Sequence, residues 1–268
     1  MLAGCRQDSA DEKPRAAVVE TKLTKVSDSA DAAPQGPQIF VVRIKIVTIE
    51  VPIGLAGAAK ELWWQLDEDN VRMIRPALLA DNGLRVGLGQ KAKWPQVAKT
   101  LSALTGQKIW ESIVLIRPGD PGQIEVKQKV QAQTIFVVNE DGTLAGRDYP
   151  PADNLLSYVC TIDQENPTHV TITVVPQIRQ LQFQPEIVLQ EGRYMMTSRP
   201  LTFSLSPLTF QATLPAEDFI VISPAAAGQY YTAGHHFLAK EKNGVEFETV
   251  LVLVPEVFRA PAPRAGGE

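Results

Sequence analysis

IFVVRIKIVTIEV, residues 39–51, consists mostly of Ile and Val, with Arg43, Lys45 and Glu50 marking a polar side. Branched side chains of this kind pack well on the pleated surface of a sheet. The stretch therefore predicts one long strand, which Pro52 and Gly54 would end. We expect the folded body of the chain to begin here.

Residues 55–117 alternate between helical and extended patterns. Pro95 suits the first turn of a helix whose apolar side chains share one face, and Gly106 suits its end. Helices are predicted at residues 58–67, at 75–81 and from Pro95 to Gly106, and strands at 84–88 and 109–117. Helices on one face of a few strands make this part a small α+β module.

From Pro118 onward the helical spacing ends, and short apolar or alternating runs are separated by turn residues. Strands are predicted at residues 124–130, 134–138, 155–162, 170–178, 181–189, 208–214, 219–222, 235–241 and 245–255. Asn243-Gly244, between the last two, is the clearest hairpin signal in the chain. This part is therefore predicted to be all β.

The predicted fold class is α+β, a small α+β module followed by a larger, mainly antiparallel all-β module. The corresponding parts are a lipid-attachment motif with a disordered tether at residues 1–38, the α+β module at 39–117, the all-β module at 118–258 and a disordered tail at 259–268. The tail is rich in Pro, Ala and Gly, so we expect it to fray.

Leu2-Ala3-Gly4-Cys5 resembles the lipobox at which bacterial lipoprotein precursors are cut before the cysteine. The resemblance implies that Cys5 is the first residue of the mature protein and carries lipid. A secretory signal needs a charged start and an apolar run, whereas only Met1 precedes the motif. We therefore expect that translation starts further upstream or that the signal has been removed. The alternative is a chance match.

The residues after this motif fit a tether between a lipid anchor and a folded body. Residues 6–38 contain no aromatic side chain, so they bury too little apolar surface to offset the entropy of ordering. No apolar run reaches the roughly 18 residues that a membrane-spanning helix needs. Attachment would come from acyl chains alone. Arg6, where lipoproteins of the inner membrane typically carry Asp, favours the outer membrane, facing the periplasm.

Segments of the β part share a pattern with one family. TITVVPQI at residues 171–178 and VLVLVPEV at 250–257 are strands that end in Pro and an aliphatic residue, and LTFQATLPAEDFIVI at 208–222 lies between them. In this order they resemble the core of the secretins, the outer-membrane rings of bacterial secretion and pilus systems. PGDPGQIEV at residues 118–126 resembles the start of that core.

The resemblance implies a structural or scaffold role in a secretion or pilus-type assembly, and a strand pair joined by a polar turn within residues 208–222. The α+β module would correspond to the ring-building domains that precede the core. Ser223-Pro224 stands where secretins carry Gly-Gly. The core is also short for both a membrane-crossing hairpin and an inner gate, which favours a degenerate relative over a self-sufficient pore. An unrelated β-sandwich is the alternative.

No residue pattern predicts catalysis, a metal site or a cofactor. The formal charge of -4 argues against nucleic acid as a partner. Cys160 lies in an apolar run and is predicted to be a buried core residue, with a disulfide to an unmodified Cys5 as the alternative. His235 and His236 would point to opposite faces of their predicted strand and so could not share a site. Val86-Gly87-Leu88-Gly89 lacks the third glycine of a nucleotide loop.

The α+β module contains all the tryptophans of the chain, namely Trp63, Trp64, Trp94 and Trp110. Most of these rings are predicted to lie in the core. Because two adjacent rings cannot both point inward, one of them is expected to mark a partner surface.

These patterns together predict a lipid-anchored, non-enzymatic protein of the cell envelope, which binds protein partners or itself through exposed strand edges. It would be a structural or scaffold component of a secretin-like assembly. A periplasmic ligand-binding or carrier lipoprotein with an apolar pocket in the β module is the alternative. A hydrolase whose site is assembled from scattered residues is a third hypothesis.

Overall fold

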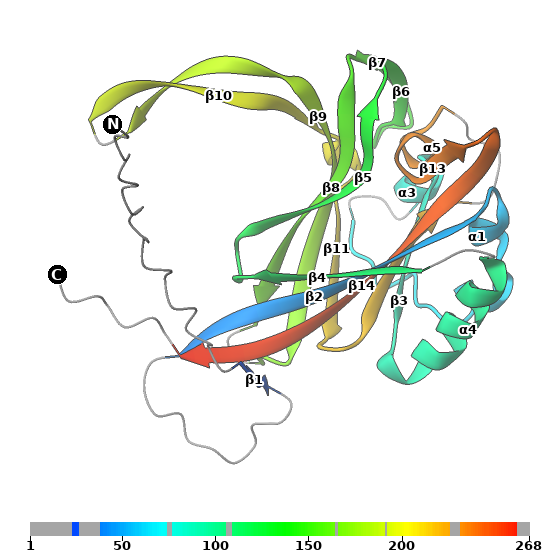
Figure 1. Cartoon of the computed structure of the whole chain (residues 1–268). Coiled ribbons are helices and arrows are strands. Elements are labelled where there is room, and N and C mark those ends of the chain that lie inside the picture. The colour runs from blue at the N-terminus through cyan, green and yellow to red at the C-terminus, as the bar shows by residue number, and fades with distance from the viewer. Residues whose placement is uncertain are drawn as a thin grey trace, which may run out of the picture.

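Two antiparallel sheets pack against each other, and helices cover the outer face of one of them (Figure 1). The structure is a computed structural model, and it describes residues 23–26, 38–73, 77–105, 109–163, 166–190, 192–225 and 231–261. Strands dominate and the helices are short, which confirms the predicted α+β class with a mainly antiparallel β part.

The first sheet has seven strands in the order β3-β12-β14-β2-β4, with β1 and β13 also paired to β14. These strands are β1 (Thr24–Lys25), β2 (Gln38–Pro52), β3 (Leu84–Gly89), β4 (Trp110–Ile116), β12 (Phe219–Pro224), β13 (Ala239–Lys242) and β14 (Val245–Pro261). We call it the long-strand sheet.

The second sheet has five strands in the order β10-β9-β8-β5, with β11 paired to β9. These strands are β5 (Pro121–Val130), β8 (Ala152–Ile162), β9 (His169–Gln190), β10 (Arg193–Ser204) and β11 (Phe210–Pro215). We call it the ribbon sheet. The remaining strands, β6 (Gln133–Val138) and β7 (Leu144–Tyr149), form a hairpin of their own.

The helices are short except for one. They are α1 (Leu55–Ala58), α2 (Lys60–Trp63), α3 (Leu78–Asp81), α4 (Trp94–Leu104) and α5 (Ala233–Leu238), with 3-10 turns η2 (Lys91–Lys93) and η3 (Ser206–Leu208). Helix α4 confirms the helix predicted from Pro95, which sits in its first turn. The helix predicted at residues 58–67 is instead split into α1 and α2 at Ala59, and its last residues lie outside both.

Strands β2 and β14 are paired along almost their whole length, from Phe247 opposite Pro52 to Pro261 opposite Gln38. The strand predicted at residues 39–51 is therefore confirmed as β2. The other edge of β14 is shared in turn by β13, β12 and β1. Strand β14 is thus the strand to which most of the long-strand sheet is attached.

β14 supplies side chains to two separate cores. Leu251 and Leu253 face the ribbon sheet, whereas Val250 and Val252 pack with residues of the helices on the other face. Successive residues of a strand point to opposite faces, so a strand buried on both faces is continuously apolar. This explains the unbroken run of aliphatic residues at this point of the sequence. Side chains of both sheets fill the space between them.

The C-terminal strands return to the sheet of the N-terminal ones. β12, β13 and β14 all begin within residues 118–258, yet they belong to the long-strand sheet with β2, β3 and β4. The sheets therefore do not divide at residue 118 as the predicted modules do. At the ends, β1 lies within the predicted tether, and β14 continues to Pro261, inside the predicted tail.

Several predicted strands differ from those observed. Residues 170–178 and 181–189 are parts of one continuous strand, β9, because β10 pairs with it across the polar residues that suggested a break. β11 and β12 do not pair with each other as the secretin resemblance implied: β11 joins β9, and β12 joins β3 and β14. The chain crosses from one sheet to the other between them.

The strand predicted at residues 235–241 is wrong at its start, where α5 forms instead. Gly234 in α5 lies against the backbone of Gly83, and a Cβ there would come within 2.0 Å of the Gly83 carbonyl oxygen. The Gly234 N–H donates to the Asn82 carbonyl at 2.8 Å. Such tertiary contacts decide the conformation of a short segment over its local pattern. The following hairpin is confirmed, with Asn243 and Gly244 both at positive φ between β13 and β14.

Asn82 joins three elements, two through its side chain and one through its backbone carbonyl. Its amide nitrogen donates to the carbonyls of Leu78 at 2.9 Å and Val138 at 3.0 Å, and its oxygen accepts the Val138 N–H at 2.8 Å. Asn82 is fully buried. Helix α3, strand β6 and, through Gly234, helix α5 are therefore held by one residue.

We predict that Asn82→Ala lowers the free energy of unfolding by about 2 kcal/mol or more, because buried backbone groups lose their partners. Urea unfolding followed by circular dichroism measures this change. Gln96→Ala, on the exposed side of α4, is the control and should change stability by less than about 0.5 kcal/mol. Equal stability of the two variants would contradict the role given to Asn82.

Candidate functional site

Beyond the body, β9 and β10 continue as a two-stranded ribbon that arches away from both sheets (Figure 1). β8 ends at Ala152, opposite Gln180 of β9, while β10 remains paired with β9 as far as Gln190. We call residues 181–190 and 193–200 the ribbon. At about 3.3 Å per residue its first strand is about 33 Å long. Within the described chain, neither outer edge of the ribbon has a strand partner.

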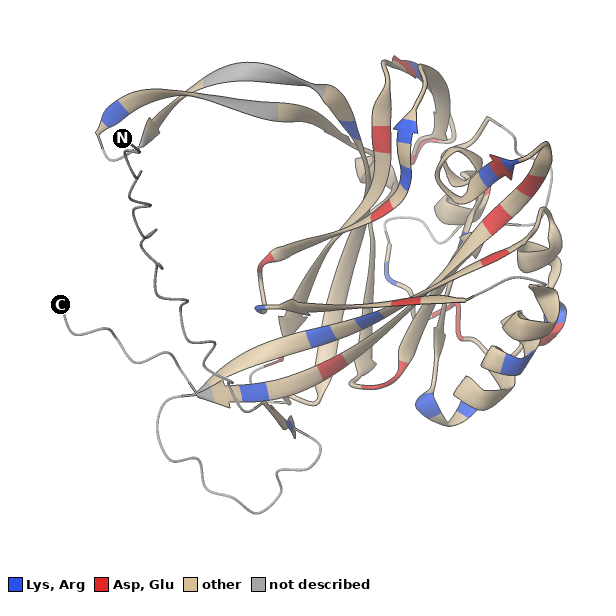
Figure 2. Cartoon of the chain, in the orientation of Figure 1, with Lys and Arg blue, Asp and Glu red and all other residues tan. Residues whose placement is uncertain are grey.

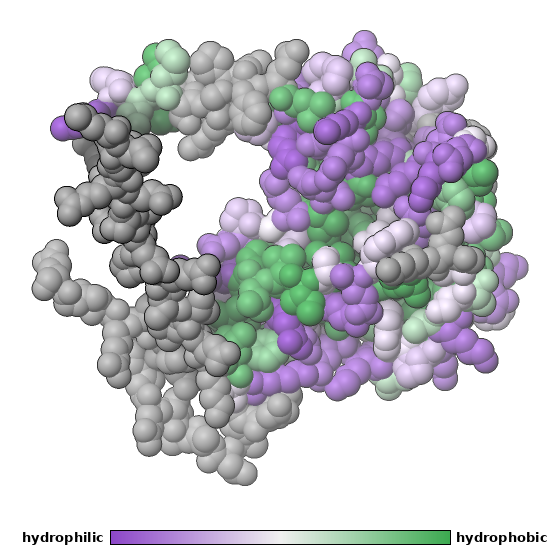
Figure 3. Space-filling model, viewed as in Figure 1, coloured by the Kyte–Doolittle hydropathy of each residue, from purple (hydrophilic) through white to green (hydrophobic). Residues whose placement is uncertain are grey.

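The bend of the ribbon carries large apolar side chains that face water. Tyr194 lies opposite Leu189, and Met196 lies opposite Ile187, so these side chains share one face. They are 81%, 64%, 76% and 68% exposed respectively. Figure 3 shows hydrophobic colouring near this bend. Contiguous exposed apolar clusters of this kind are typical of binding surfaces.

The sequence of the ribbon and its turn carries charged residues of both signs, namely Glu186, Glu191, Arg193 and Arg199. Among its residues and base, the charged side chains that the structure describes are Arg193 at the bend and Arg179 at the base. Figure 2 shows charged residues of both signs along the strands and helices of the body.

A second open edge lies on the body. β4 is the last strand of the long-strand sheet and exposes Trp110, Ile113 and Leu115. Figure 3 shows hydrophobic colouring in this region as well. Ile113 lies opposite Lys45 and Leu115 lies opposite Arg43, so this patch lies among charged side chains of β2.

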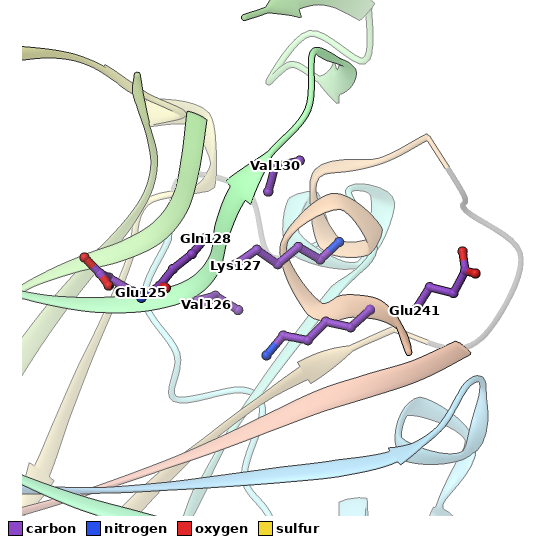
Figure 4. A pocket seen from close by; sticks show the side chains of 7 residues that line it. Glu125, Val126, Lys127, Gln128, Val130 and Glu241 are labelled. Carbon is purple, nitrogen blue, oxygen red and sulfur yellow. Dashed lines mark hydrogen bonds between the residues drawn. The ribbon is translucent and has the colours of Figure 1, made fainter. Parts of the chain in front are cut away.

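A cleft of about 490 Å³ lies where β5 approaches β13 (Figure 4). It is lined by residues 125–128 and 130 and by Lys240 and Glu241. Figure 4 shows Lys127 pointing from β5 toward α5. The Lys127 ammonium group donates one long hydrogen bond, of 3.5 Å, to the carbonyl oxygen of His235. Burial, and then the charge of Lys240, lower the pKa of Lys127 to about 8.

The two histidines of α5 lie next to this cleft. Burial, and then the charges of Lys127 and His235, lower the pKa of His236 to about 4, and burial also lowers the pKa of His235. The Nε2 atom of His236 is buried and has no hydrogen-bond partner. His235 and His236 lie on a helix with ring centroids 6.1 Å apart, so the prediction that they occupy opposite faces of a strand is wrong. They and Lys127 form one cluster of basic groups.

Cys160 and Gly89, which were also singled out in the sequence, lie in packed surroundings. Cys160 is fully buried with a free thiol, as predicted, and burial raises its pKa to about 12. Gly89 lies opposite Phe219, whose ring occupies the space that a Cβ would need. Cys5 and most of the predicted tether lie outside the described residues.

The adjacent tryptophans divide as predicted. Trp63 is 3% exposed and belongs to the core under the helices, whereas Trp64 is 75% exposed. Trp94 packs edge-on against Phe219, with ring centroids 5.1 Å apart. Trp110 is exposed on β4, so the prediction of a core position holds for Trp63 and Trp94 and is wrong for Trp110.

In the part of the chain that the structure describes, no group of three or more His, Cys, Asp or Glu side chains could hold a metal ion. The described helices include none with the length and hydropathy needed to cross a membrane.

Comparison with solved structures finds distant likeness to secretins. No protein-family model matches the sequence, and no curated protein matches it. The secretin-domain β-barrel of InvG from the Salmonella SPI-1 injectisome has 8% identity and a TM-score of 0.21, over 86% of this chain and 65% of that one.

Two further secretin structures have comparably low sequence identity and TM-scores. A chain of the Klebsiella pneumoniae type II secretion system outer membrane complex, which contains PulD, PulS and PulC, has 8% identity and a TM-score of 0.21, over 85% of this chain and 40% of that one. The type II secretin GspD of enteropathogenic Escherichia coli has 10% identity and a TM-score of 0.18, over 84% of this chain and 69% of that one. A likeness this distant assigns no function to the present chain.

We predict that the free energy of unfolding falls as the pH is lowered from about 6.5 to about 4, because the unfolded chain then binds a proton at His236 that the folded chain does not accept. Above this window His236 is neutral in both states and has no such effect. Urea unfolding at a series of pH values measures the slope. His236→Gln should make the slope shallower, and an unchanged slope would contradict the prediction.

Proposed function

We propose that this chain is a non-enzymatic structural protein of the cell envelope that associates, through its ribbon, with copies of itself in a secretin-like assembly. The observation that carries the proposal is the ribbon: two open edges and a shared apolar face at the bend, both exposed to water. Open backbone edges pair with other strands, and buried apolar side chains would stabilise that pairing. Burying a large apolar side chain contributes about 1.5–3 kcal/mol.

The motifs of the secretin resemblance lie on the strands that matter for this role. TITVVPQI, residues 171–178, is the body half of β9 and leads directly into the ribbon. VLVLVPEV, residues 250–257, is the central part of β14. In the proposed assembly the first motif would fix the ribbon to the body, and the second would hold the body together.

The alternative of a carrier with an apolar pocket needs an enclosed cavity in the β module. Buried side chains from both sheets form one continuous core between them, including Ile44 of β2 and Leu156 and Tyr158 of β8. The cleft beside Lys127 is lined largely by charged and polar side chains. Neither place offers the apolar lining that such a ligand would require.

A lipid anchor at Cys5 is the second part of the proposal. The chain that would lead from it reaches the body at β1, which pairs Thr24 and Lys25 with the last residues of β14. In Figure 1, β1 and the ribbon lie on the left of the molecule and α1 and α4 on the right. An anchor on the N-terminal side would therefore leave the helices facing away from the attachment point. We place this anchor in the outer membrane, facing the periplasm.

The ribbon is tested by placing charge on its apolar face. We predict that Ile187→Lys combined with Met196→Lys converts an oligomer into a monomer, because two ammonium groups cannot be buried in the interface without a partner. Analytical ultracentrifugation of the folded chain at micromolar concentration measures the mass.

Leu144→Lys combined with Val245→Lys is the matched control, since these side chains are 61% and 52% exposed and lie away from the ribbon. The control should associate like the wild type. A wild type that stays strictly monomeric, or an oligomer that survives in the ribbon variant, would overturn the proposal.

We further predict that Cys5 carries acyl chains in the native host when the gene is expressed with its natural upstream sequence. Mass spectrometry of the N-terminal peptide detects them, and Cys5→Ala should move the protein from the membrane fraction to the soluble fraction. The ribbon variant provides the control, because it should remain lipid-modified. An unmodified thiol at this position would refute the anchor and leave the ribbon untouched.

A further inference from the structure

The cleft beside Lys127 lies between two open sheet edges. β5 pairs with β8 on one side only, and β13 pairs with β14 on one side only, as far as the described residues go. Helix α5 lies beside the space between them (Figure 4). The cleft is therefore a junction of the two sheets and is independent of the ribbon.

The backbone of β5 is irregular where it meets this cleft. The pairing of β5 with β8 shifts register both between Glu125 and Lys127 and between Lys127 and Val130. Lys129 has a φ of 52°, in the left-handed region that residues other than glycine seldom occupy, and its N–H donates to Asp153 at 2.8 Å. Register shifts of this kind redirect side chains, and they are frequent beside functional sites. Here the irregular stretch carries Lys127 toward α5.

Lys127 is a half-buried cation whose own contacts do not satisfy it. An ammonium group has three donors, whereas the one hydrogen bond of Lys127 is long and goes to a neutral carbonyl. No carboxylate of the described chain lies within ion-pair distance of it, and Lys240 brings a second positive charge close by. An unpaired buried charge is costly, so proteins retain one mainly where it has a role.

The acidic residues of the cleft do not balance these cations. The carboxylate of Glu125 binds Arg179 at 2.5 Å and also accepts a hydrogen bond from Gln128. Figure 4 shows the Glu241 side chain directed away from Lys127. The two acidic side chains that line the cleft are therefore engaged elsewhere or turned outward.

We propose that this cleft binds an oxyanion, a phosphate or carboxylate group, between the ammonium groups of Lys127 and Lys240. An oxyanion supplies the acceptors that Lys127 lacks and separates the two positive charges. With a volume of about 490 Å³, the cleft has room for a small molecule or a terminal group that carries the anion. Anion binding at this cleft would be a function separate from the proposed assembly through the ribbon.

Binding should depend on pH through the titratable groups in and around the cleft. These are Lys240 and Glu241 on β13, Glu125 on β5, Glu246 on β14 and the two histidines of α5. Since the pKa of Lys127 is about 8, affinity should fall as the pH rises above that value and the ammonium group loses its proton. Protonation of His235 below neutral pH would add a positive charge and strengthen binding.

Isothermal titration of the full chain with inorganic phosphate, and separately with acetate, at constant ionic strength tests the proposal. We expect at least one of these anions to bind, with affinity reduced at least tenfold in Lys240→Met and in Lys127→Met. Lys242→Met, on the same hairpin but outside the cleft, is the matched control and should bind as the wild type does.

The two titrations distinguish the source of the anion. Binding of phosphate alone identifies a phosphorylated ligand, binding of acetate alone identifies a carboxylate, and binding of both identifies a general oxyanion site. Lys127→Met keeps an apolar stem of similar length, so it should fold, and Lys240→Met tests the site independently if it does not. Failure of both anions to bind, or equal loss in the Lys242→Met control, would overturn the proposal.

Discussion

The antiparallel pairing of β2 with β14 is the interaction on which the rest of the structure depends. β2 begins the described body and β14 ends it, so their pairing joins the two ends of the fold in one ladder. Every other strand of the long-strand sheet except β3 pairs directly with one of these two. Both strands also contribute to the core against the ribbon sheet and to the core under the helices. Losing this ladder would separate both cores at once.

The ribbon sheet, in contrast, is covered over only part of its length. In its body half, β9 alternates buried residues such as Ile172 and Val174 with half-buried ones, as expected of a strand with one covered face. Past Gln180 there is no opposing sheet, yet the apolar residues continue to the bend. Two strands alone are marginally stable in water. A second chain that covered the ribbon would therefore bury its exposed apolar surface and stabilise its two strands.

The sequence predicts those features of the fold that neighbouring residues determine, and misses those that depend on residues far apart in the chain. The strand at residues 39–51, helix α4 and the Asn243-Gly244 hairpin follow from neighbouring residues alone, and the burial of Cys160 follows from its apolar run. The return of β12 and β14 to the sheet of β2 does not, because it pairs residues far apart in the chain. Helix α5 owes its shape to contacts with Asn82 and Gly83. The cleft had no signal in the sequence, since its lining comes from β5 and β13, which are far apart in the chain.

The attachment of β1 has a mechanical consequence. β1 holds only two residues against β14, reinforced by ion pairs of Lys25 with Glu217 and Glu256. A force applied from the N-terminal side would reach this short pairing first and would load β2 only after β1 had detached. β2 would then be loaded along a ladder that runs to Pro52. The pairing of β1 would therefore yield before the β2–β14 ladder does.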